Sequence, residues 1–275
     1  MSDAEEFASV RAERDPIRRG RRATELLTLY QQRAAELARL RREAIEQAHA
    51  ERQMSYTEIA TALGITKGRV TQIRADAPRR ERAFFGVGPV AVGVPYRYQT
   101  TDRSRPLIAA EDARTGEQVE QVLASLGFAI TRFQLEPEAE QLPFGDVALV
   151  CGPKSAPVAA QLIASDPALG MEEHAGRWWI LDRNTGQRLG SPADDSSAEA
   201  ADLAYLARRR VDDRIVVHVA GLHAMGSLGA VHYLTNHLED LSPDADDACM
   251  SCVIRSQYDG LDITSSELVS GPHRW

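Results

Sequence analysis

The sequence is poor in cysteine and contains no long hydrophobic run. Three cysteines stand among its 275 residues, Cys151, Cys249 and Cys252, too few for a framework of disulfide bonds. Cys249 and Cys252 form one Cys-Met-Ser-Cys spacing without a second pair, so ordinary thiols are expected rather than a metal or redox centre. No apolar stretch approaches the roughly 18 residues of a membrane span, and the acidic N-terminus lacks the apolar segment of a secretory signal. These absences predict a cytoplasmic protein that does not enter a membrane and holds no metal and no cofactor.

Basic residues gather in the first third of the chain. The net charge is −8, yet residues 1–82 carry 17 Lys and Arg against 13 Asp and Glu, whereas residues 83–275 carry 15 against 27. A basic head on an acidic body favours one face for nucleic acid and a body that repels it. The length also allows two modest domains.

The N-terminal third predicts a tail followed by helices. Residues 1–17 are polar and charged, which indicates a disordered tail before a helical domain over residues 18–82. From about Arg18 to Arg52 there is no proline, and apolar residues recur at steps of three and four. This pattern predicts an amphipathic helix, or two joined in line, whose apolar stripe is too long to stand alone in water. The stripe must pack on the following helices or on a second copy of itself, so we expect a homodimer through this helix.

The strongest local signal lies between residues 53 and 76. Ser55 followed three residues later by Glu58 forms a capping box that begins one helix, and Thr66 can cap a second helix. Gly64 can take a positive φ at the corner between them. A small residue in the first helix and branched apolar residues in the second allow the two helices to cross closely. The segment therefore predicts a helix-turn-helix unit.

Three short stretches of this segment match a known pattern: Tyr56-Thr57-Glu58-Ile59-Ala60, Leu63-Gly64-Ile65 and Val70-Thr71-Gln72-Ile73. With these residues the segment resembles the helix-turn-helix of the fourth conserved region of bacterial sigma-70-type factors, and the related DNA readers of small actinobacterial regulators. The region that would bind the polymerase core has no counterpart in this sequence. The resemblance therefore implies a DNA-binding module and not a sigma factor; a purely structural helical hairpin is the alternative.

In a DNA reader of this kind, the second helix carries the contacts. Arg and Gln can bind base edges in the major groove in a bidentate manner, whereas Thr and Lys suit phosphates or the thymine methyl group. Arg79, Arg80 and Arg82 follow as a basic linker suited to the DNA backbone. The predicted contacts with double-stranded DNA are Thr66, Lys67, Gly68, Arg69, Thr71, Gln72 and Arg74.

After Arg82 the sequence becomes rich in Gly, Val and Pro, which predicts a second domain over residues 83–275. Short apolar runs alternate with helical patterns there, which is typical of an α/β fold with an open sheet and helices on both faces. We expect a helical head joined to a mostly parallel α/β sandwich. The predicted strands cover residues 90–96, 107–110, 129–135, 147–151, 203–207, 215–220 and 250–258, a hairpin covers 178–190, and the predicted helices cover 116–126, 156–164 and 224–238.

Two strand-turn-helix passages in this domain predict a ligand site. In a parallel sheet such turns lie at the carboxyl edge, where free backbone N–H groups and the helix dipole favour an anion. Neither turn has a complete phosphate motif, because Ser227 stands where a P-loop has lysine, and close helix–strand packing is the alternative reason for the glycines. Arg97, Arg103 and Arg105 around Thr101-Asp102 offer a second anion clamp, or surface ion pairs. The predicted ligand contacts are Gly152, Pro153, Lys154, Ser155, Gly221, His223, Gly226 and Ser227.

The two turns, with a Trp-x-x-Asp hairpin at Trp179 leading into Ser191-Pro192, resemble the C-terminal domains of uncharacterised actinobacterial regulators. That resemblance implies co-occurrence with DNA-binding heads and no particular activity. The leading hypothesis is a one-component transcriptional regulator whose body senses a small anionic or nucleotide-like effector. The alternatives are a nucleotide-processing enzyme or defence effector anchored by its helix-turn-helix, and a module that binds a protein partner. The enzyme is less favoured because no complete set of nucleophile, base and orienting residue is recognisable.

Overall fold

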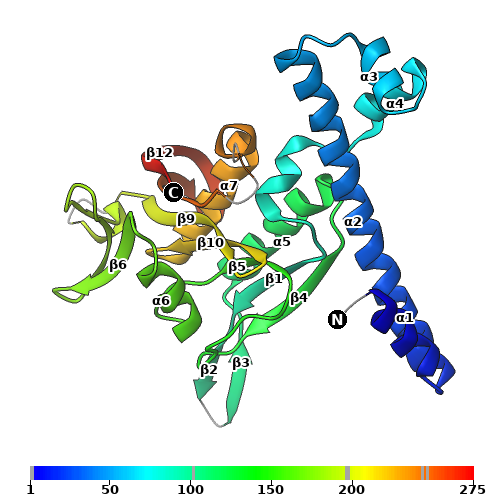
Figure 1. Cartoon of the computed structure of the whole chain (residues 1–275). Coiled ribbons are helices and arrows are strands. Elements are labelled where there is room, and N and C mark those ends of the chain that lie inside the picture. Colours follow the sequence, from blue (N-terminus) through cyan, green and yellow to red (C-terminus); the bar gives the residue numbers. More distant parts are fainter. Residues whose placement is uncertain (1–2, 101–102, 196–198, 243–244, 246–247) are drawn as a thin grey trace.

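The computed structural model describes residues 3–100, 103–195, 199–242, 245 and 248–275. Figure 1 shows a long helix that runs beside a body built on a central sheet. Among the described residues, no helix combines the length and the apolar character that a membrane crossing needs. The helices are α1 (Asp3–Ala12), α2 (Pro16–Glu51), α3 (Tyr56–Ala62), α4 (Lys67–Asp76), α5 (Ala110–Ser125), α6 (Pro157–Ala164) and α7 (Ala224–Leu241), with two 3-10 helices, η1 (Arg80–Phe85) and η2 (Pro192–Asp194).

The first described residues form a helical hairpin with the start of α2, so the prediction of a disordered tail is wrong for residues 3–17. α1 folds back on α2, and Phe7 packs against Tyr30 with the ring centroids 5.8 Å apart. Asp15 caps α2 by accepting a backbone N–H of its first turn at 2.8 Å, and Pro16 occupies the first helical position. The predicted amphipathic helix is confirmed as one element of 36 residues.

Two short capped helices follow α2, at the positions that the sequence predicts. The capping box of Ser55 and Glu58 is present at the start of α3, and Gly64 has a φ of +66° at the corner. Thr66 caps α4 by accepting a backbone N–H. The end of α2 joins α3 and α4 around a small apolar cluster of Ile45, Ile59, Ala60, Val70 and Ile73.

A seven-stranded mixed sheet forms the centre of the body, in the order β12-β11-β9-β10-β5-β1-β4. β10, β5, β1 and β4 run parallel, whereas β9 pairs antiparallel with β10 and β11, and β12 pairs antiparallel with β11. The mixture of helices and a sheet with parallel strands agrees with the predicted α/β class, but the prediction of a mostly parallel sheet is wrong. The strands are β1 (Val90–Pro95), β4 (Ile130–Leu135), β5 (Asp146–Val150), β9 (Ala201–Val211), β10 (Arg214–Gly221), β11 (Met250–Asp259) and β12 (Asp262–Arg274).

Short turns account for two of the antiparallel pairings in the sheet, β9 with β10 and β11 with β12. β9 and β10 are joined at Asp212, which has a φ of +55°, and β11 and β12 are joined at Gly260, which has a φ of +58°. Such short connections can only reverse the chain, since parallel neighbours need a crossover of a dozen residues or more. The long strand β12 was not predicted at all.

Two smaller sheets flank the central one. β2 (Arg97–Thr100) and β3 (Ser104–Leu107) form a hairpin, while β6 (Leu169–His174), β7 (Arg177–Asp182) and β8 (Arg188–Gly190) form a three-stranded sheet. The hairpin predicted over residues 178–190 is confirmed as β7 and β8. The strand predicted over residues 107–110 is wrong, because Leu107 ends β3 and Ala110 already begins α5.

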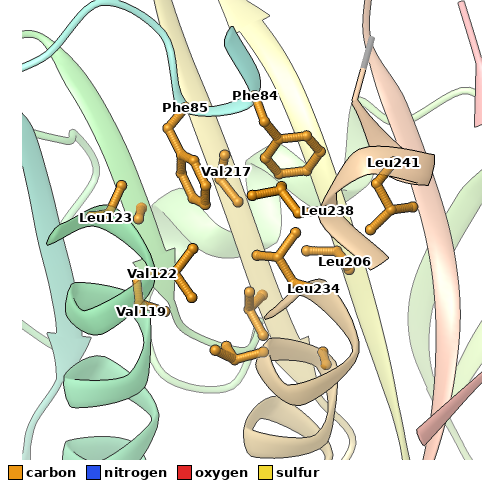
Figure 2. Packing of buried hydrophobic residues seen from close by; sticks show 14 of the residues in the cluster. Phe84, Phe85, Val119, Val122, Leu123, Leu206, Val217, Leu234, Leu238 and Leu241 are labelled. Atoms are coloured by element: carbon orange, nitrogen blue, oxygen red, sulfur yellow. The ribbon is translucent and has the colours of Figure 1, made fainter. Parts of the chain in front are cut away.

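Helices cover both faces of the sheet, as predicted. Alternate strand residues point to opposite faces: Ala148 and Val150 face α5 and α7, whereas Val147 and Leu149 face α6. The three-stranded sheet packs beside α6 on a third apolar cluster. Figure 2 shows the largest cluster, where α5 and α7 lie side by side and meet Phe84, Phe85, Leu206 and Val217.

A buried arginine joins the long helix to the body. Arg82 is fully buried, and its guanidinium donates to Gln32 Oε1 of α2 at 2.6 Å, to the Leu126 carbonyl at 3.0 Å and to the Val87 carbonyl at 2.8 Å. It also lies 3.7 Å from the ring centre of Phe128. The hypothesis that Arg82 contacts the DNA backbone is therefore wrong, because its charge is used inside the protein.

The predicted domain boundary after Arg82 falls inside η1. Phe84 and Phe85 of this helix belong to the largest core cluster of the body. Arg208 of β9 donates to the backbone carbonyls of Ala83 and Phe84 at 2.9 and 3.0 Å. The connection between head and body is thus a packed element and not a free linker.

Replacing Arg82 with alanine should destabilise the whole chain by about 3 kcal/mol or more, because it leaves buried acceptors on α2 and at the end of α5 without their donor. Urea unfolding followed by circular dichroism measures the change. Arg80→Ala is the matched control, since Arg80 is exposed. Equal stabilities of the two variants would contradict the structural role of Arg82.

Candidate nucleic-acid interface and ligand cavity

One side of α4 is open to solvent along its length. Val70 and Ile73 point inward to the apolar cluster of the head and are 1% and 4% exposed. α3 and α4 stand at the end of α2 that is remote from α1, and they project away from the central sheet (Figure 1). Six of the seven predicted DNA contacts are exposed, namely Thr66, Lys67, Gly68, Arg69, Thr71 and Gln72.

The polar groups of this face are partly organised by local hydrogen bonds. Arg69 donates from Nη1 to Gln72 Oε1 at 2.6 Å, so the two side chains lie together on one turn. The hydroxyls of Thr66 and Thr71 are engaged with the backbone of α4. Arg69 and Gln72 are therefore two neighbouring side chains on the exposed face that can both form bidentate hydrogen bonds with base edges.

Arg74 departs from the predicted arrangement. It is half-buried, and its guanidinium lies 4.4 Å from the ring centre of Tyr56 on α3. A cation–π contact of this kind holds the two short helices together. The structure therefore places Arg74 at the junction of α3 and α4, at the border of the exposed face.

The two predicted turns meet at one cavity of about 330 Å³. They follow β5 and β10, neighbouring parallel strands whose carboxyl ends share an edge of the sheet. The end of β1 and the start of α5 complete the wall. Seven of the eight predicted ligand contacts line the cavity: Gly152, Pro153, Lys154, Ser155, Gly221, His223 and Ser227.

Gly226 is the exception, and its role is packing. A Cβ on Gly226 would lie 2.4 Å from the Leu203 carbonyl, so only glycine fits between α7 and β9. Its N–H donates to the buried carboxylate of Asp202 at 2.7 Å, and the N–H of His223 donates to the same oxygen at 3.1 Å. Asp202 thus satisfies part of the α7 N-terminus that the sequence assigned to an anionic ligand.

The remaining groups of the two turns are held in place by their neighbours. The Ser227 hydroxyl accepts the N–H of Gly221 at 2.9 Å, and Lys154 donates from Nζ to the Leu222 carbonyl at 3.2 Å. His223 Nε2 lies 2.9 Å from a carboxylate oxygen of Asp194. Burial lowers the pKa of Lys154, an effect that the nearby Asp194 opposes. The cavity therefore has a fixed polar wall.

Three charged residues of the wall come from outside the two turns. Arg97 of β2 was noted in the sequence as part of an anion clamp; its neighbours Thr101 and Asp102 lie outside the described residues. Glu111 and Asp112, on the first turn of α5, were not predicted. Acidic residues in the first turn of a helix usually interact favourably with the helix dipole. Their presence there is therefore no signal in the sequence that Glu111 and Asp112 face a cavity.

The strand residues beneath the cavity are poor nucleophiles. Burial raises the pKa of the Cys151 thiol to about 12, which keeps it protonated at neutral pH. His218 lies fully buried on β10, with Nε2 2.8 Å from the Cys151 carbonyl oxygen, and burial lowers its pKa to about 4. Of the two residues, Cys151 lines the cavity, and His218 lies behind it.

No protein-family model matches the chain, and a search of curated proteins found no significant match. The resemblance of residues 56–73 to the sigma-70 helix-turn-helix therefore stays a prediction from the residues themselves.

The buried His218 should make stability fall with acidification. Its folded pKa of about 4 lies below the ordinary 6.5, so between these values the unfolded chain binds a proton that the folded chain does not. Above pH 6.5 the free energy of unfolding contains this contribution of neutral His218 in full. As the pH falls the contribution is lost, so that the free energy of unfolding is about 3 kcal/mol lower at pH 4.

Urea unfolding of the His218→Gln variant across pH 4–8 measures this contribution, since glutamine can still donate to the Cys151 carbonyl. The variant should have a flatter profile than the parent chain, and His174→Gln, at an exposed histidine, should not. The comparison is between variants because burial raises the pKa of Asp112 and Asp202, which acts in the opposite direction. Identical profiles for His218→Gln and the parent chain would refute the assignment.

Proposed function

We propose that this chain is a DNA-binding transcriptional regulator whose α/β body senses a small molecule. The observation that carries the proposal is the open face of α4, on which Arg69 and Gln72 stand side by side. Both side chains can make bidentate hydrogen bonds to base edges, and the major groove is wide enough for an α-helix. α3 would then cross the backbone in the manner of a helix-turn-helix protein.

The position of the head supports the proposal that α4 contacts DNA. The helix stands beyond the edge of the acidic body, so a duplex could approach it without meeting the sheet (Figure 1). Lys67 and Arg69 supply positive charge at the start of α4, and Arg52 lies exposed at the end of α2. Cationic groups of this kind bind phosphates independently of sequence and hold the reading helix in register.

A dimer through α2 is part of the proposal. Leu27 and Leu37 are 62% and 66% exposed on this helix, so a single copy of the chain does not bury them. Ala34 and Ala44 are also exposed, and the four residues follow one another at steps of seven, three and seven, as positions of a heptad repeat do. Two copies paired there would present two α4 helices to neighbouring turns of one duplex.

The sensing role rests on the route from the cavity to the head. The cavity lies at the start of α5 and α7, and the far end of α5 reaches Leu126, whose carbonyl receives the buried Arg82. Arg82 in turn contacts Gln32 of α2. A ligand that shifts α5 would therefore change the angle at which α2 carries the head.

Replacing both Arg69 and Gln72 with alanine should weaken binding to a duplex selected from a random pool by about 100-fold, since each base contact contributes about 1–3 kcal/mol. Fluorescence anisotropy at fixed salt measures the affinity. Gln187→Ala with Arg188→Ala, on the remote β8 hairpin, removes the same residue types and should leave affinity unchanged. Unaltered affinity of the α4 variant, with the fold intact, counts against the proposal.

Replacing Leu27 and Leu37 with glutamate should convert a dimer into a monomer and lower the apparent affinity for a two-site duplex by at least tenfold, because like charges would face each other along the seam. Light scattering after size exclusion gives the mass. Val269→Glu, at an apolar residue of β12 that is 42% exposed, is the control. A parent chain that is monomeric at micromolar concentration is the outcome that rejects the α2 dimer.

A further inference from the structure

The cavity at the carboxyl edge of β1, β5 and β10 carries charges of both signs. Arg97, Lys154 and His223 bring cationic or proton-binding groups to its wall, and Glu111 and Asp112 bring carboxylates. A volume of about 330 Å³ is at the small end of the range for ligand pockets. A ligand that fits here must be small and must satisfy two kinds of charge.

Asp112 is the buried charge of this wall that lacks a partner. It is 8% exposed, and no hydrogen bond or ion pair to its carboxylate is formed by any residue in the described ranges. Burial raises the pKa of Asp112, the nearby Arg97 opposes this, and Glu111 adds to it. A buried carboxylate without a donor is unfavourable, so a cationic ligand group placed on Asp112 would stabilise the site.

The cationic groups of the wall are also available to a ligand. The Arg97 guanidinium has no ion-pair or hydrogen-bond partner within the part of the chain that is described. Lys154 donates one of its N–H groups to the Leu222 carbonyl, which leaves two for a ligand. His223, in contrast, is engaged with Asp194. Arg97 and Lys154 are therefore the groups that would hold a negative charge.

A plain anion uses only half of this wall. The α7 N-terminus is partly filled by Asp202, which accepts the N–H groups of His223 and Gly226. A free phosphate or a dicarboxylate would in addition bring its charge near Glu111 and Asp112, which repel it. The arrangement suits a molecule that carries one cationic and one anionic group close together.

We propose that the effector is a zwitterion of amino-acid size, with its ammonium on Asp112 and its carboxylate toward Arg97 and Lys154. This inference rests on the proposed sensing function of the body and replaces the anionic or nucleotide-like effector with a specific chemical class. The side chain of the ligand would then face the opening of the cavity, where it sets the choice among amino acids.

The test is a titration of the full chain with each of the twenty standard L-amino acids, first by thermal shift and then by calorimetry. At least one of them should bind, and its analogues that lack the amino or the carboxyl group should bind at least tenfold more weakly. Asp112→Asn should weaken binding by about 30-fold or more, since it removes one partner of a buried charge pair. Arg97→Gln tests the other end of the ligand independently.

Glu117→Gln is the matched control, because it makes the same chemical change at an exposed position of α5. Its affinity should equal that of the parent chain. Binding of AMP or inorganic phosphate without any amino acid, unchanged affinity of Asp112→Asn, or no binding by any amino acid would each overturn the inference. DNA binding by the same preparations is measured in parallel. If no amino acid binds while DNA binding stays intact and depends on α4, the zwitterionic effector is rejected and the proposed DNA-binding function is not.

Discussion

The buried guanidinium of Arg82 is the interaction on which the arrangement of the molecule depends. One side chain donates to α2, to the end of α5 and to the loop that leads into β1, and it stacks on Phe128. An arginine can hold three elements in this way because its five N–H groups form a rigid planar fork. Because Gln32 and Leu126 are buried, a small slide of α2 or α5 away from Arg82 would leave polar groups unsatisfied.

Neighbouring residues also fix the loop that contacts Arg82. Gly88 has a φ of +84°, and a Cβ there would lie 2.7 Å from Phe128 and 2.9 Å from Gln32. Asp146 accepts the N–H groups of Val87 and Gly88 at 2.8 Å. The loop between η1 and β1 is therefore fixed on both sides, and α2 meets a rigid surface. This rigidity is what would allow a change at the cavity to reach the head.

Local signals made the head predictable from its sequence. The capping box of Ser55 and Glu58, the glycine at position 64 and the cap at Thr66 each act within four residues, so no tertiary information was needed. The meeting of the two body turns was predictable for a different reason: the carboxyl ends of neighbouring parallel strands share an edge whatever the details of the fold.

The features that were missed depend on contacts that are distant in the sequence. The pairing of β9 with both β10 and β11 could not be read from apolar runs, because buried parallel and antiparallel strands look alike there. Arg82 stands beside the exposed Arg80, and only the three-dimensional structure separates the buried charge from the exposed one. The same holds for Asp112, which resembles any acid in the first turn of a helix.

The central claim is that two copies of α4 read one duplex. The most direct measurement is a hydroxyl-radical footprint of the full chain on a duplex selected from a random pool. The account predicts two protected stretches of backbone, each flanking one major groove, related by two-fold symmetry and separated by about 10 base pairs or a multiple of that spacing. Uniform weak protection that follows salt concentration alone, or no protection at low salt, would contradict it.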